Sequence, residues 1–111
     1  MDAISSAMII KALDGLSARA VATAENIANA GSPNFRPLRV SFEQALASAA
    51  QGGLASVDAV RPLVAADASG AGVRVDMELA TAAETSSRYA ALVDLLGRQM
   101  QLESLAVSGN R

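Results

Sequence analysis

The chain has 111 residues, a formal net charge of −2 and a pI near 4.9, so it forms at most one domain and lacks the basic surplus of a nucleic-acid-binding protein. It contains no His and no Cys, which excludes catalysis by a Ser/His or Cys/His pair and the usual zinc sites. We therefore expect neither enzymatic activity nor a cofactor. Ala accounts for 25 residues and aromatic residues for 3%, so the chain favours helix but has little side-chain area to bury. This composition predicts a marginally stable monomer that gains structure by assembly.

The first predicted element is a helix from about Asp2 to Ala30. Its apolar or small residues recur at alternating steps of four and three, which is the heptad pattern of a coiled coil or helical bundle. Gly15 costs about 1 kcal/mol in a helix interior, so we expect the N-terminal third to fray. The predicted seam consists of Ile9, Leu13, Leu16, Ala20, Thr23, Ile27 and Ala30.

The start of the chain, "MDAISSAMIIKAL", differs from a secretory signal peptide. Asp2 is acidic, and the first basic residue, Lys11, follows the apolar stretch instead of preceding it. No apolar run approaches the roughly 20 residues that a membrane-spanning helix needs. We therefore expect neither a cleaved signal nor a transmembrane segment.

The helix should end within "ENIANAGSPNF". Gly31 fits the left-handed residue that follows a helix, and Pro33 prevents continuation. Asn26 and Asn29 have two interpretations. In the first, both are solvated residues near a helix end. In the second, Asn26, which is a full turn upstream, bonds the backbone of the returning turn or of a neighbouring subunit. Asn is a mediocre helix former, which gives the second interpretation weight.

The middle of the chain changes character. Ser41-Phe42-Glu43-Gln44 is a capping-box pattern that predicts a short helix to about Ala50. Two Gly-containing stretches, at 52–53 and 70–72, indicate flexible joints, and "VRPLV" and "VRVD" are candidate short strands.

A second long helix is predicted from about Met77 to Val107. Asp76 is a suitable N-cap with Glu78 in the first turn, and Gly109 and Arg111 are end signals. These two carboxylates could in principle bind a cation, but capping is the favoured interpretation. Two apolar stripes run along the helix, which indicates more than one neighbour. The first is Leu79, Ala82, Ser86, Tyr89, Val93, Leu96, Met100 and Val107, and the second is Leu92, Leu95, Leu102 and Leu105.

The sequence thus predicts an all-α fold in which the N- and C-terminal helices pair as a coiled-coil-like hairpin. The central region is loose and can hold short strands. We expect a single domain with three parts: residues 1–31, 32–72 and 73–111.

"NIANAGSPNFR" resembles the asparagine-rich signature of the flagellar axial proteins, the rod, hook and hook–filament-junction subunits. The usual form reads roughly Asn-Asn-Ile-Ala-Asn, two variable residues, then Thr-Pro-Gly-Tyr-Lys. Glu25 departs from the first Asn, and Asn34 replaces the Gly; Asn also accepts the positive φ that such a turn can require. The positions that match are Asn26, Ile27, Ala28, Asn29 and Pro33, with Ser32, Phe35 and Arg36 as conservative replacements.

Two further stretches are similar to the proximal rod members of this family. They are "VSFEQAL" and "VRVDMELATAAETSSRYAALVDLLGRQM", so the resemblance covers about residues 9–47 and 73–107 and leaves out the middle.

The resemblance implies a structural subunit of the flagellar basal-body proximal rod that serves cell motility. The alternatives are another flagellar rod subunit or a soluble coiled-coil adaptor module. A proximal rod subunit would be a type III export substrate without a cleaved signal, located in the periplasm-spanning rod. Its partners would be copies of itself, other rod subunits, the junction of the rod with the membrane ring, and the export machinery.

The residues expected to make subunit contacts combine the motif with two apolar positions on the C-terminal helix. Tyr89, the only Tyr, is expected to be buried with its hydroxyl paired, against the first helix or a neighbouring subunit. The full set is Asn26, Ile27, Asn29, Pro33, Phe35, Tyr89 and Leu96.

Overall fold

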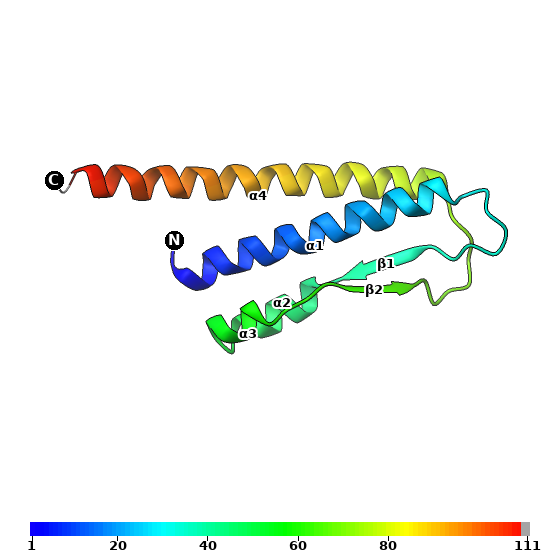
Figure 1. Cartoon of the computed structure of the whole chain (residues 1–111), viewed down its shortest axis with the longest axis horizontal. Helices are drawn as coiled ribbons and strands as arrows, with labels where there is room; N and C mark the ends of the chain where they lie inside the picture. Colours follow the sequence, from blue (N-terminus) through cyan, green and yellow to red (C-terminus); the bar gives the residue numbers. More distant parts are fainter. Residues whose placement is uncertain (110–111) are drawn as a thin grey trace.

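Two long helices in contact dominate the computed structural model, which describes residues 1–109 (Figure 1). The predicted helical hairpin is confirmed, and the central region holds a short antiparallel sheet. The elements in chain order are α1 (Ala3–Ala28), β1 (Leu38–Ser41), α2 (Glu43–Ala50), α3 (Leu54–Asp58), β2 (Leu63–Ala66) and α4 (Val75–Gly109).

The elements lie side by side, with α1 in the middle (Figure 1). Antiparallel α4 covers one side of α1, and the β1–β2 hairpin with α2 and α3 covers the other. The molecule measures 64 × 27 × 13 Å, so its shortest dimension is close to the width of one helix. Its radius of gyration is 17.4 Å, against about 13 Å for a compact domain of this length. Both broad faces of the molecule are therefore open.

The hydrophobic core is small and lies on the hairpin side of α1. It joins Leu16 and Ala22 of α1 to Val40, Phe42, Leu46 and Val57, and among the described residues of α4 only Leu92 packs against it. The ring of Phe42 lies against the backbone of Gly15. Gly15 lowers the helix propensity of α1, but it also permits this close contact with Phe42, which a side chain at position 15 would prevent.

The ends of α1 differ in part from the prediction. The Asp2 side chain accepts a 2.7 Å hydrogen bond from the Ser5 N–H and caps the first turn. The C-cap is Asn29, and Gly31 is not in the left-handed region, so that prediction was wrong. The positive φ occurs instead at Asn34, at 63°. Asn34 replaces the Gly of the axial-protein signature, and Asn was expected to accept a positive φ there.

The short helix α2 has the predicted extent but not the predicted cap. Ser41 ends β1, where it is paired across the sheet with Leu63, so it cannot cap a helix. Phe42 is the N-cap and makes no side-chain capping bond, because its ring has no oxygen to accept one; the ring lies in the core instead. The candidate strand "VRPLV" overlaps β2, whereas "VRVD" leads into α4 and is not a strand.

The start of α4 also corrects the prediction. Asp76 lies in the first turn and is not the N-cap, and Arg111 is outside the described residues. The predicted seam of α4 is largely exposed, as at Leu79, Val93 and Met100, while the buried residues are Glu78 and Thr85. Within residues 1–109, no helix combines the length and the hydropathy needed to cross a membrane.

Candidate functional site

Asn26 is fully buried on α1 and bonds the chain that returns after the turn. Its Oδ1 accepts a 2.8 Å hydrogen bond from the Leu38 N–H, and its Nδ2 donates to the Leu38 carbonyl at 3.0 Å. The amide thus pairs with β1 through both backbone groups of one residue, as a neighbouring strand would. Of the two interpretations of Asn26, the bond to the returning backbone is confirmed and the solvated residue is excluded.

The same amide reaches α4 through Glu78, whose side chain is 2% exposed. Asn26 Nδ2 donates to Glu78 Oε2 at 3.1 Å, and Arg39 of β1 donates to Glu78 Oε1 at 2.7 Å. The Glu78 hydrogen bond raises the pKa of Arg39 above its usual value. Arg39 also binds Asp67, beyond β2, at 3.0 Å. We call Asn26, Arg39, Glu78 and Asp67 the polar cluster; it ties α1, the hairpin and α4 together.

Glu78 corrects the earlier interpretation of the two carboxylates. Asp76 is exposed and pairs with Arg74 at 3.3 Å, whereas Glu78 points into the polar cluster. The two carboxylates therefore have separate partners, and Glu78 neither caps the helix nor shares a cation site with Asp76. Sequence reasoning missed Arg39 and misjudged Glu78 because Glu78 is bonded to Arg39 across 39 residues and to Asn26 across 52 residues.

A second set of charges, centred on Arg19, joins α1, α2 and α4. Arg19 of α1 binds both oxygens of Glu43 at 2.7 and 2.8 Å and donates to the Val40 carbonyl at 2.7 Å. Its guanidinium lies 5.0 Å from the centre of the Phe42 ring, and Arg88 of α4 approaches Glu43 at 3.5 Å. The Arg19 hydrogen bonds lower the pKa of Glu43 to about 2.

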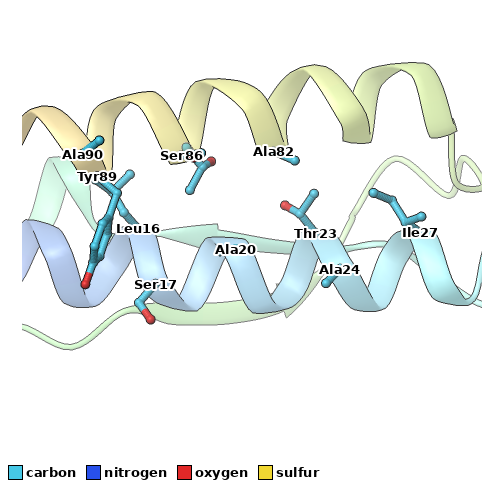
Figure 2. Close-up of a pocket in the computed structure, with 11 residues that line it drawn as sticks. Leu16, Ser17, Ala20, Thr23, Ala24, Ile27, Ala82, Ser86, Tyr89 and Ala90 are labelled. Atoms are coloured by element: carbon cyan, nitrogen blue, oxygen red, sulfur yellow. The ribbon is translucent and has the colours of Figure 1, made fainter.

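A groove of about 490 Å³ runs between α1 and α4 (Figure 2). We call it the α1–α4 groove. Most of its lining side chains are small, and none of those described is charged, so its walls are apolar with a few hydroxyls. The lining residues are Leu16, Ser17, Ala20, Thr23, Ala24, Ile27, Ala82, Thr85, Ser86, Tyr89 and Ala90.

Besides Asn26, three of the predicted contact residues lie along the two long helices. Ile27 and Tyr89 line the α1–α4 groove, and Leu96 is half-buried further along α4. Tyr89 is 41% exposed, and its hydroxyl is not among the described hydrogen bonds. The first helix therefore does not bury this side chain, because its neighbours across the groove are too small to cover it. Burial against a neighbouring subunit stays a prediction.

The other predicted contact residues lie in the turn after α1, which Figure 1 shows at the end of the molecule where α4 begins. The Asn29 Nδ2 donates to the Glu25 carbonyl at 2.9 Å, and its Oδ1 accepts from Ser32 at 3.2 Å. Pro33 is exposed and Phe35 is half-buried. Asn29 thus shapes its own turn, while Asn26 joins distant elements, so the two amides have different roles.

The apolar surface of α4 is largely uncovered. Only Glu78 and Thr85 of this 35-residue helix are buried. Ten of its large apolar side chains are exposed, which is the arrangement expected of a helix that has a partner outside the chain. They are Val75, Met77, Leu79, Tyr89, Val93, Leu95, Met100, Leu102, Leu105 and Val107.

Comparison with models of known protein families finds none that matches this chain, and comparison with curated proteins finds no match. The geometry defines a flat helical protein with a polar cluster built on buried Asn26 and Glu78, and with a long, uncovered apolar helix.

Proposed function

We propose that this chain is a self-assembling structural subunit of the bacterial flagellar rod. The observation that carries the proposal is its excess of surface. The chain exposes 7035 Å², whereas a compact monomer of 11.3 kDa exposes about 5,700 Å². The difference, about 1,300 Å², exceeds the roughly 800 Å² that one partner contributes to a standard interface. A chain of this shape has area for more than one neighbour.

The character of the exposed surface supports assembly over catalysis. The uncovered side chains of α4 are large and apolar along most of its length, and burying such area is the main favourable term in association. The α1–α4 groove is open and uncharged. Head-to-tail contacts between identical subunits build a filament when the rotation between copies does not close a ring.

The motif supports the choice of family. Asn26, the first matched residue of the signature, determines where the hairpin meets α1 and where α4 docks, through Leu38 and Glu78. A subunit that must present the same surfaces to every neighbour benefits from such a fixed junction. Among axial proteins, the chain resembles the proximal rod protein FlgB in "VSFEQAL" and in the α4 sequence. Another rod subunit is the nearest alternative, and a soluble coiled-coil adaptor is the second.

Purified flagellar basal bodies test the proposal. In the source bacterium, an antibody against this chain should detect it in basal bodies, with its unprocessed N-terminus identified by mass spectrometry. Deletion of the gene should abolish hooks and swimming, and the intact gene should restore both. An adaptor would instead leave the basal bodies free of this chain. Normal hooks in the deletion strain would contradict the proposal.

A further inference from the structure

One exposed stripe of α4 consists of three leucines on its C-terminal half. Leu95, Leu102 and Leu105 are 47%, 60% and 68% exposed. At 100° per residue they lie within an arc of about 80°, and we call them the leucine ridge. Arg98 projects from the same side, but its guanidinium is paired with Asp94 at 2.9 Å. The ridge is thus a row of large apolar side chains that carries no net charge.

The α1–α4 groove has the complementary character. Ala and Ser side chains form much of its walls, and larger side chains such as Leu16, Ile27 and Tyr89 bound it. Large side chains of one helix insert into hollows between smaller side chains of others in knobs-into-holes packing. An uncharged groove with small walls therefore fits a row of leucines better than it fits a polar or charged partner.

The ridge and the groove lie on opposite sides of α4. Ser86 of the groove and Leu102 of the ridge are 16 positions apart, which is a rotation of about 160° and an axial distance of roughly 24 Å. A rigid helix cannot fold back to bring these two positions together, so one chain cannot fill its own groove. After two copies join in this way, one groove and one ridge remain free.

We propose that the leucine ridge of one copy packs into the α1–α4 groove of the next copy, displaced along α4 by roughly 24 Å. The proposal rests on the proposed function, because it specifies a contact by which the subunit polymerises. The contact is heterologous and leaves complementary surfaces at both ends, so it propagates along a row of subunits. It also covers Tyr89, which the single chain leaves 41% exposed.

Cysteine cross-linking tests the contact, since the chain has no Cys of its own. Ser86→Cys and Leu102→Cys are purified separately, mixed at high concentration and oxidised. Both sites are exposed, and circular dichroism checks that both variants fold. We expect a mixed disulfide dimer in at least tenfold excess over the dimers that either variant forms alone. Leu105→Cys, one turn further on, tests the neighbouring register in the same way.

Matched controls use adjacent serines. Ser87→Cys stands next to the groove position but outside the groove lining, and Ser104→Cys lies between two ridge leucines on another side of α4. We expect neither control to form the mixed disulfide, because a disulfide requires the two Cα atoms to lie about 4.4–6.8 Å apart. Equal cross-linking by these controls would overturn the contact, and so would a preference for Leu102→Cys homodimers. The absence of a mixed dimer at millimolar concentration with both ridge variants would overturn it as well.

The outcome for the rod assignment is separate. If the chain is present in basal bodies but the mixed dimer does not form, the ridge-in-groove contact is wrong and the rod assignment stands. If the mixed dimer forms but basal bodies lack the chain, the contact stands and the rod assignment is wrong.

Discussion

The ring of Phe42 occupies the space where a Cβ on Gly15 would lie. α1 and the start of α2 therefore approach closely at Gly15, and the absence of a side chain there leaves room for the ring. The same ring stacks beneath Arg19, whose guanidinium binds Glu43 of α2. One glycine thus permits a contact that holds the hairpin side of the molecule against α1.

In Gly15→Ala, the added methyl group overlaps the Phe42 ring and forces it to move, which costs about 1–3 kcal/mol. The better helix propensity of Ala offsets about 0.8–1 kcal/mol of this cost, so the free energy of unfolding should fall by about 0–2 kcal/mol. Gly97→Ala is the matched control, since it also lies inside a long helix but has open space at its Cβ position. There the better helix propensity of Ala should raise stability by about 0.8–1 kcal/mol. Urea unfolding measures both. Stabilisation by both substitutions would show that Phe42 adjusts without cost.

Asn26→Ala should be the most damaging substitution in the motif. It leaves the Leu38 N–H without its partner, leaves the Leu38 carbonyl with only a 3.4 Å bond from Arg39, and removes one donor from Glu78. A buried group left unpaired costs about 1–3 kcal/mol. Asn29→Ala and Glu25→Ala are the controls, as both change sites that are not fully buried. Glu25→Ala should change the free energy of unfolding by no more than about 0.5 kcal/mol. Asn29→Ala removes two hydrogen bonds within its own turn and should cost about 0.5–1.5 kcal/mol. Equal effects of all three substitutions in chemical denaturation would contradict the role of Asn26.

In cells, Asn26→Ala and Glu25→Ala distinguish an effect on export from an effect on assembly. If the chain is a rod subunit, Asn26→Ala should still be exported but should reduce the number of hooks, because the junction that orients α4 is weakened. Glu25→Ala should leave hooks unchanged. Electron microscopy of isolated basal bodies gives the count. Normal hooks in Asn26→Ala cells would show that assembly tolerates a weakened junction.

The Arg39–Glu78 ion pair should contribute more than an exposed pair does. Glu78 is 2% and Arg39 49% exposed at the side chain, so one partner has lost nearly all of its hydration. A double-mutant cycle with Arg39→Ala and Glu78→Ala should give a coupling energy above about 1 kcal/mol, the upper limit for most surface pairs. The Asp94–Arg98 pair of α4 is exposed at both ends and should give about 0.3–0.5 kcal/mol. Indistinguishable couplings would mean that water reaches Glu78.

Acidification should remove the stability that Glu43 contributes. Its pKa is about 2 in the folded chain and 4.5 as the ordinary value, so the contribution is complete above pH 4.5 and is lost as the pH falls towards 2. The Glu43 side chain is 45% exposed, and solvent screening limits the effect to about 1 kcal/mol or less.

Glu43→Gln provides the comparison for this titration. Unfolding measured at about pH 6 and about pH 2 should show a smaller acid-induced loss in this variant than in the unmodified chain. Asp67 also has a pKa lowered to about 2, chiefly by hydrogen bonds from Ser69, so it titrates in the same range in both proteins. The difference between the two chains therefore isolates Glu43. Identical losses would show that the Arg19 pair has no net effect on stability.

The sequence by itself determined the features that depend on local chemistry. The extents of α1 and α4 agree with the helical periodicity to within about two residues, because that period arises within the helix itself. The end of α2 near Ala50 was predicted as well, although its cap was not. The positive φ at Asn34 follows from the conformational tolerance of Asn.

Only the tertiary structure decided which side of each helix is covered and by what. Periodicity identified apolar stripes but not their partners, so Leu79 and Tyr89 were expected inside, while buried Glu78 was given a capping role. The bond between Asn26 and Glu78 spans 52 residues, and no local pattern encodes a pairing that depends on the packing of α1, β1 and α4 together. Propensity alone likewise makes Gly15 a destabilising residue of α1, whereas the structure shows that the Phe42 ring packs against it. In a flat molecule one helix thick, burial depends on neighbours far away in the sequence, and on copies outside the chain if the proposed assembly holds.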